Sequence, residues 1–131
     1  MTLDNIRIEV ARTLSSSWGT ATAIAWPNHS FDPPAGPWIK PTIRMGGSFM
    51  GELGDDGIGI RTGVLMIGVY DIPNNGEANV RGLAGRIEGI FRRADLNGVH
   101  FEEPSSDTIG LDESNYYGIM VSIPFTTWIG E

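Results

Sequence analysis

Apolar residues recur along this chain with two spacings, one typical of helices and one typical of strands. Near the N-terminus they lie three and four residues apart, which predicts an amphipathic helix over residues 2–17, ended by Gly19. Its apolar face is formed by Leu3, Ile6, Val10 and Leu14. A second amphipathic helix is predicted over residues 77–94. Its apolar stripe is formed by Val80, Leu83, Ala84, Ile87, Ile90 and Phe91.

Three longer segments have the pattern of strands. Residues 117–125 have the period of a half-buried strand, with Tyr117, Ile119, Val121, Ile123 and Phe125 on one face. Residues 38–45 place Ile39, Ile43 and Met45 on one side and Lys40, Thr42 and Arg44 on the other. Pro41 cannot donate a ladder hydrogen bond, so this strand is expected at a sheet edge or with a bulge. Residues 60–71 are apolar on both sides, which predicts a central strand covered on both faces.

Shorter strands are predicted over residues 21–26, 99–103 and 109–111, and residues 104–106 are predicted to be a break. The glycine-rich residues 46–59 are predicted to form a flexible loop. The order of these elements predicts an α+β fold, with a single mixed, mostly antiparallel sheet and two helices on one face. A length of 131 residues indicates one domain covering residues 1–131.

Composition argues against several classes of function. The net charge is −7 and Lys40 is the single lysine, which disfavours general binding to nucleic acid. The chain has no cysteine, so disulfides and thiolate metal sites are excluded. Neither His29 nor His100 lies in a metal-binding pattern, and no catalytic, phosphate-binding or cofactor motif is present. We therefore predict a non-enzymatic protein without metal or cofactor.

The N-terminus has no pattern of a signal peptide. The longest apolar stretch, around residues 63–70, is far shorter than the roughly 20 residues that span a bilayer. No membrane association is expected. The residues from Asp71 to Gly76 resemble a calcium loop weakly, but Pro73 breaks the pattern and a turn before a helix is the simpler interpretation.

Glycines on the second predicted helix suggest an interface. Gly82, Gly85 and Gly89 fall opposite the apolar stripe, and Arg86 and Arg93 flank them on one side. Each helical glycine costs up to about 1 kcal/mol relative to alanine. We hypothesise that this face docks a neighbouring subunit, with the arginines pairing to its acids. The alternatives are tolerated glycines on a solvated helix, or a contact within the same chain.

Apolar residues in the glycine-rich loop are a second interface candidate. Phe49, Met50 and Leu53 are unfavourable to expose to water, and a mobile loop could bury them when it orders against a partner. The alternative is a loop that folds back on its own core.

Several phrases together resemble a known family. They are Pro37-Trp38-Ile39-Lys40-Pro41-Thr42-Ile43, Arg61-Thr62-Gly63-Val64-Leu65, Val69-Tyr70-Asp71-Ile72-Pro73, Gly76-Glu77-Ala78, Leu83-Ala84-Gly85-Arg86-Ile87 and Ile90-Phe91-Arg92. In this order they are similar to the tail terminator and minor tail proteins of bacteriophages with long non-contractile tails.

The resemblance implies a structural role. It implies a homo-hexameric ring that caps the tail tube, contacts the tail tube protein and a head-completion or stopper protein, and lets DNA pass without specific binding. It places the protein in the virion at the head–tail junction, and in the host cytoplasm during assembly. Alternatives are a head-completion or stopper connector, a tail tube subunit, or a small-ligand binding domain with a pocket near His100 and the tryptophans.

Overall fold

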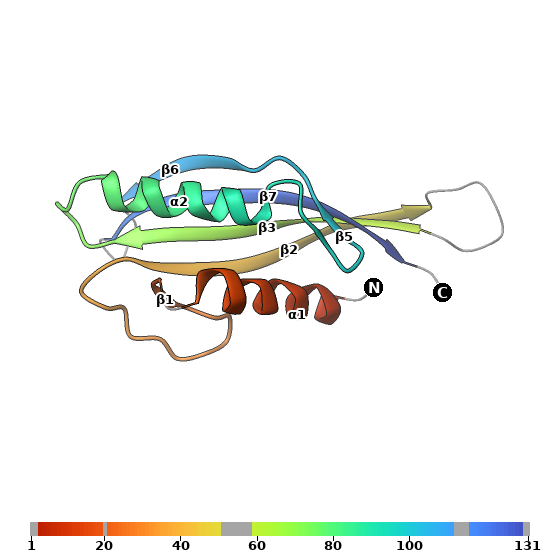
Figure 1. The fold of residues 1–131 in the computed structure, drawn as a ribbon, viewed down its shortest axis with the longest axis horizontal. Coiled ribbons are helices and arrows are strands. Elements are labelled where there is room, and N and C mark those ends of the chain that lie inside the picture. The colour runs from red at the N-terminus through yellow and green to blue at the C-terminus, as the bar shows by residue number, and fades with distance from the viewer. Residues whose placement is uncertain (1–2, 20, 51–58, 112–115, 130–131) are drawn as a thin grey trace.

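The computed structural model describes residues 3–19, 21–50, 59–111 and 116–129 (Figure 1). The elements in chain order are α1 (Leu3–Thr13) with a π-helical turn (Leu14–Trp18), β1 (Ala23–Ile24), β2 (Trp38–Met50), β3 (Gly59–Asp71), α2 (Ala78–Phe91), β4 (Asp95–Leu96), β5 (Val99–Phe101), β6 (Ser105–Leu111) and β7 (Tyr117–Ile129). The strands form one sheet in the order β1-β2-β3-β7-β5-β4, and β6 also pairs with β7. The β1–β2 pair is parallel and the others are antiparallel, which confirms the predicted α+β fold.

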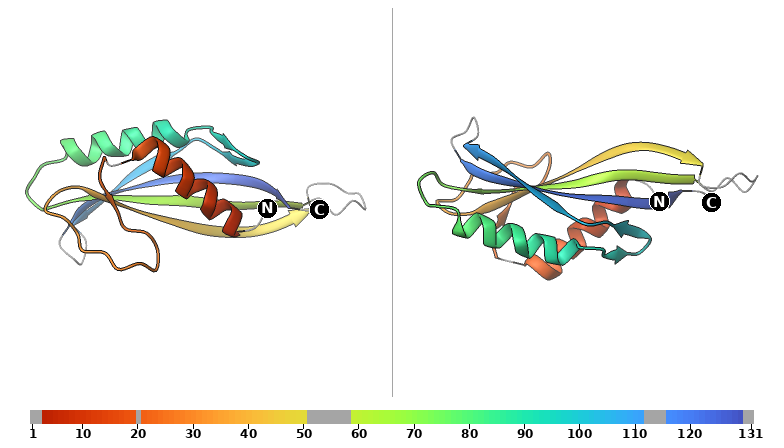
Figure 2. Two further views of the ribbon diagram at one scale, coloured as in Figure 1. Left: turned by 60° about the horizontal axis from the view of Figure 1, so that its bottom comes forward. Right: turned by 90° about the horizontal axis from the view of Figure 1, so that it is seen from above.

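The strand β3 lies at the centre of the sheet, as predicted, between β2 and β7. Its side chains alternate, so Leu65, Ile67 and Val69 point to one face, where all three are fully buried. Both helices lie on that face of the sheet (Figure 2). The core therefore occupies a single layer between the sheet and the two helices.

The apolar stripes of both predicted helices face this core. Ile6, Val10 and Leu14 are buried, and so are Val80, Ala84, Ile87 and Phe91. Gly19 ends the first helix with a φ of 61°, and its N–H donates to the carbonyl of Leu14. The second helix ends earlier than predicted, at Phe91, because Arg92 leaves the helical conformation with a ψ of 114° and Arg93 adopts a left-handed backbone with a φ of 52°.

Strand boundaries differ from the prediction where glycine or polar residues give no apolar pattern from which strand pairing can be predicted. Residues 46–50 were expected in a loop but continue β2 beyond a bulge between Met45 and Ser48, because β3 supplies a pairing partner. The strand β6 begins at Ser105, where a break was predicted, and pairs with β7. The strand β1 covers two residues instead of the six expected. The unpredicted strand β4 is joined to β5 by a turn at Asn97 and Gly98, both with positive φ.

The second face of the sheet carries no helix among the described residues, so the predicted cover on both faces is not provided by helices. Aromatic rings cover one end of this face instead. The Trp38 ring stacks on Tyr70 with a centroid distance of 4.7 Å, and Phe31 lies 5.0 Å from Trp38. The Tyr70 ring occupies the space above Gly68 and Gly118, where an added Cβ would come within 2.6 and 2.7 Å of it. We call this face the open face.

On the core face of the sheet, Gly63 provides a test of close packing. An alanine Cβ there would lie 2.5 Å from the Phe125 ring and 2.8 Å from the carbonyl oxygen of Arg44. Phe125 is a core side chain and the carbonyl belongs to the ladder, so neither can move freely. We expect Gly63→Ala to lower the free energy of unfolding by about 1–3 kcal/mol in urea titrations.

Gly82→Ala is the matched control, because an added Cβ meets no atom within 4 Å there. It should raise the free energy of unfolding by about 0.5–1 kcal/mol, as expected for glycine in an exposed helix interior. Equal effects of the two substitutions would contradict the close packing at Gly63.

Candidate assembly interface

The glycine face of α2 is open in the structure. Gly82, Gly85 and Gly89 are all exposed, and an added Cβ at each meets nothing within 4 Å. Among the described residues, no segment of the same chain therefore covers these positions. Hollows adjoin the face on both sides, of about 440 Å³ beside Gly82 and about 250 Å³ beside Gly85. The face is sterically available for close backbone approach, and subunit docking there stays a prediction.

Arg86 lies beside the glycine face and already has partners within the chain. Its guanidinium carbon lies 5.0 Å from the centroid of the Trp18 ring, and its Nη2 donates to the carbonyl of Ser17 at 3.4 Å. The arginine therefore links α2 to the end of the N-terminal helix through a cation–π contact. Arg93 is exposed, and its backbone N–H donates to the carbonyl of Glu102. Pairing of either side chain with a neighbour's acids stays a prediction.

Glu77 joins the start of α2 to the sheet. It accepts hydrogen bonds from Nε of Arg81, at 2.9 Å, and from the hydroxyl of Tyr117 on β7. The hydrogen bond from Arg81, and then that from Tyr117, lowers the pKa of the Glu77 carboxyl below its ordinary value of 4.5. The hydrogen bond that the Tyr117 hydroxyl donates to Glu77 raises the pKa of this hydroxyl above 10.0, because ionised Tyr117 would place a second negative charge beside the Glu77 carboxylate.

The loop candidates cannot be placed as a site. Leu53 lies outside the described residues, and Phe49 and Met50 belong to β2 in backbone only, with side chains outside the described part. Their role in assembly stays a prediction.

The two histidines lie apart from these surfaces. His29 is exposed in the loop before β2, and Nδ1 of His100 lies 3.3 Å from a carboxylate oxygen of Asp95. The described part of the chain contains no cluster of three or more metal-ligating side chains. It also contains no helix of the length and apolarity needed to cross a membrane. The Asp71 carboxylate accepts hydrogen bonds from the Ile72 N–H and the Asn75 amide, as in a turn.

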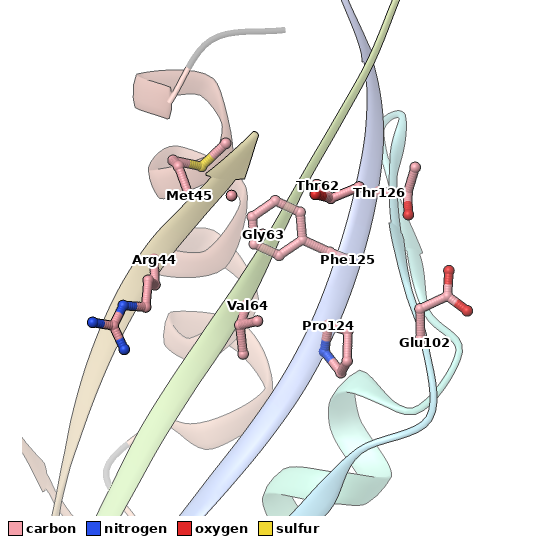
Figure 3. Close-up of a pocket in the computed structure, with 10 residues that line it drawn as sticks. Arg44, Met45, Thr62, Gly63, Val64, Glu102, Pro124, Phe125 and Thr126 are labelled. Atoms are coloured by element: carbon pink, nitrogen blue, oxygen red, sulfur yellow. The ribbon is translucent and has the colours of Figure 1, made fainter. Parts of the chain in front are cut away.

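The open face of the sheet was not singled out from the sequence. A hollow of about 500 Å³ lies across it, with Arg44 at one end and Glu102 at the other (Figure 3). The strict alternation of Lys40, Thr42 and Arg44 against Ile39 and Ile43 was the available signal, since it places charged groups on the face without helices. The long-range pairing that brings Glu102 to the same face has no local signal.

The described elements define a small α+β protein with one sheet and two helices on one face. A family model described as phage tail terminator protein matches residues 5–125. The chain therefore belongs to the phage tail terminator family, which confirms the resemblance seen in the sequence. Membership supports a structural role in the phage tail and a place in the tail of the virion.

Solved structures share the fold. Eleven chains match, and one of them aligns with a TM-score of 0.69 and 19% sequence identity over 97% of this chain and 96% of its own. At that identity the similarity establishes the fold alone. No curated protein matches the sequence.

Leucines on the glycine face test the docking hypothesis. Gly82→Leu combined with Gly85→Leu fills the exposed face with two side chains, so we expect a folded monomer whose assembly onto tails is impaired. Incorporation into purified particles is the measurement. Gly82→Ala with Gly85→Ala is the control and should assemble, because methyl groups project little. Normal incorporation of the leucine variant would rule out docking through this face.

The Glu77 contacts predict a pH dependence. Because the folded pKa of Glu77 lies below 4.5, its contribution to stability is present above pH 4.5 and is lost as the pH falls through the folded value. The stability difference between the wild type and Glu77→Gln should therefore be constant at neutral pH and shrink below pH 4.5. Urea unfolding across this range measures it, and Tyr117→Phe should show a smaller change of the same sign. A pH-independent difference would contradict the assignment.

Proposed function

We propose that this protein is the tail terminator of a long-tailed phage, forming a homo-hexameric ring that ends the tail tube and joins it to the head. The observation that carries the proposal is the family match over residues 5–125, which spans every described element except the first two residues of α1 and the last four of β7. The glycine face and the open sheet face leave surface available for neighbours on more than one side of the chain.

The charge of the chain is compatible with this role. A net charge of −7 disfavours retention of DNA, so DNA can pass such a ring without specific binding. On this proposal the partners are the tail tube protein on one side and a head-completion or stopper protein on the other. The protein acts in the virion at the head–tail junction, assembles in the host cytoplasm and catalyses no reaction.

Deletion of the gene from its phage tests the proposal. A tube that lacks its terminator continues to polymerise, so we expect full heads beside unattached tails of irregular, excessive length. Negative-stain electron microscopy of the lysate is the measurement. The wild-type gene supplied from a plasmid is the control and should restore tails of uniform length.

The other outcomes separate the alternatives. Tails of normal length beside empty or leaking heads would assign the protein to the head-completion or stopper position. Loss of all tails would assign it to the tube itself. Unaltered particles would contradict any structural role at the junction.

A further inference from the structure

Charged side chains stand at opposite edges of the open face, in the same cross-strand row. Lys40 of β2 pairs with Gly68 of β3, Gly68 pairs with Met120 of β7, and Met120 pairs with Asp107 of β6. Paired residues of antiparallel strands point to the same face. Lys40 therefore lies at the β2 edge and Asp107 at the β6 edge, on one face and at one level of the sheet.

A second row repeats this arrangement. Arg44 pairs with Val64, Val64 pairs with Pro124, and the Glu102 N–H donates to the Pro124 carbonyl. Figure 3 shows these four residues crossing the open face, with Arg44 and Glu102 at the two ends. The rows are four residues apart on β7, about 13 Å. The spacing of the two cations at one edge therefore matches the spacing of the two acids at the other.

All four charged side chains are exposed, and none forms an ion pair within the described residues. Other cations differ: Arg7, Arg81 and Arg92 each pair with an acid of the same chain. The charges at the two edges of the open face are thus available to a partner.

The two edges are open along part of their length. On the outer side of β2, β1 pairs with Trp38 and Ile39, and the Ala25 N–H donates to the Ile39 carbonyl. On the other side, the Arg93 N–H donates to the Glu102 carbonyl, whereas β6 has no strand partner on its outer side among the described residues. Two large apolar side chains of the described part are exposed, Ile109 at 38% and Leu111 at 59%, and both belong to β6. The acidic edge therefore offers apolar surface as well as charge.

We propose that a second copy of this chain places its β2 edge against the edge formed by Glu102 and β6 of the first, with Lys40 beside Asp107 and Arg44 beside Glu102. We call this second edge the β6 edge. The inference rests on the proposed ring and specifies which surfaces of neighbouring subunits meet in it. The strands β2 and β6 run in opposite directions, because three antiparallel pairings connect them: β2 with β3, β3 with β7, and β7 with β6. Copies related by rotation about an axis along the strands would therefore bring these edges together antiparallel.

Charge selects this arrangement over a two-fold dimer. In a two-fold dimer through the β2 edges, Lys40 and Arg44 of one copy would face the same two cations of the other copy. A two-fold dimer through the β6 edges would bring acids against acids, and both contacts are unfavourable. A cation edge that meets an acid edge is a heterologous contact, which closes into a ring when the rotation allows it. Pro41 and the bulge after Met45 interrupt the outer edge of β2 as a hydrogen-bonding template, so side-chain charge defines the register of the contact.

Cysteine cross-linking tests the geometry directly, because the chain contains no native cysteine. A chain carrying Lys40→Cys and Asp107→Cys cannot close an internal disulfide, since the two sites lie three strand spacings apart, about 14 Å. In purified particles, non-reducing electrophoresis should show a ladder extending beyond the dimer. Each single variant should stay monomeric. A dimer from a single variant, or no ladder from the double variant, would overturn the proposal.

Charge exchange tests the pairing by function, measured as complementation of the gene deletion. Lys40→Asp alone and Asp107→Lys alone place like charges at every contact, so each should reduce phage titre by on the order of tenfold or more. Lys40→Asp combined with Asp107→Lys restores opposite charges and should recover the titre. Co-expression of the two single variants should also recover it, because alternating copies present complementary edges.

The controls separate folding and function from the contact. Circular dichroism and thermal unfolding of each single variant should match the wild type, since all four side chains are exposed. Full complementation by both single variants, in a phage whose deletion gives overlong tails, would overturn the edge contact and leave the terminator function standing. A deletion without a tail defect would instead overturn the function on which the inference rests.

Discussion

The pairing of β3 with both β2 and β7 determines which face of the sheet each side chain of these three strands occupies. Leu65, Ile67 and Val69 are fully buried against the helices, and this burial holds the register, because a slip of one residue would move all three to the open face. The same register places Lys40, Arg44 and Asp107 on the open face. The surfaces proposed for assembly therefore depend on the packing of the core.

Elements with their own hydrophobic period were predicted from the sequence. Both helices and the three long strands carry enough apolar residues to be recognised from the sequence, and the apolar stripes of the helices face the core as predicted. The strand β3 is the exception, because cover was predicted on both its faces and, among the described residues, helices cover only one. The strand β6 was largely missed because Ser105, Ser106 and Asp107 have no apolar alternation, and its place in the sheet comes from pairing with β7. The extension of β2 past Gly46 was missed for the same reason, since glycine suggests a loop until β3 provides the ladder.

The candidate interface could be predicted only in part. A helical wheel places Gly82, Gly85 and Gly89 on one face from spacing alone, and the structure finds that face exposed. The wheel could not show that Arg86 lies over Trp18, because that contact joins helices far apart in the sequence. The sequence also could not predict that Lys40 and Asp107 lie at opposite ends of one cross-strand row, because β3 and β7 lie between the strands that carry them.

The ring of Tyr70, held above Gly68 and Gly118, has an evolutionary consequence. These three positions share one space, so each restricts what the others can accept. In descendants of this gene the two glycines should persist as long as an aromatic ring occupies position 70, and loss of the ring should release both at once. The three positions form a unit of covariation that links two neighbouring strands, recognisable across homologues even where the surrounding residues have diverged.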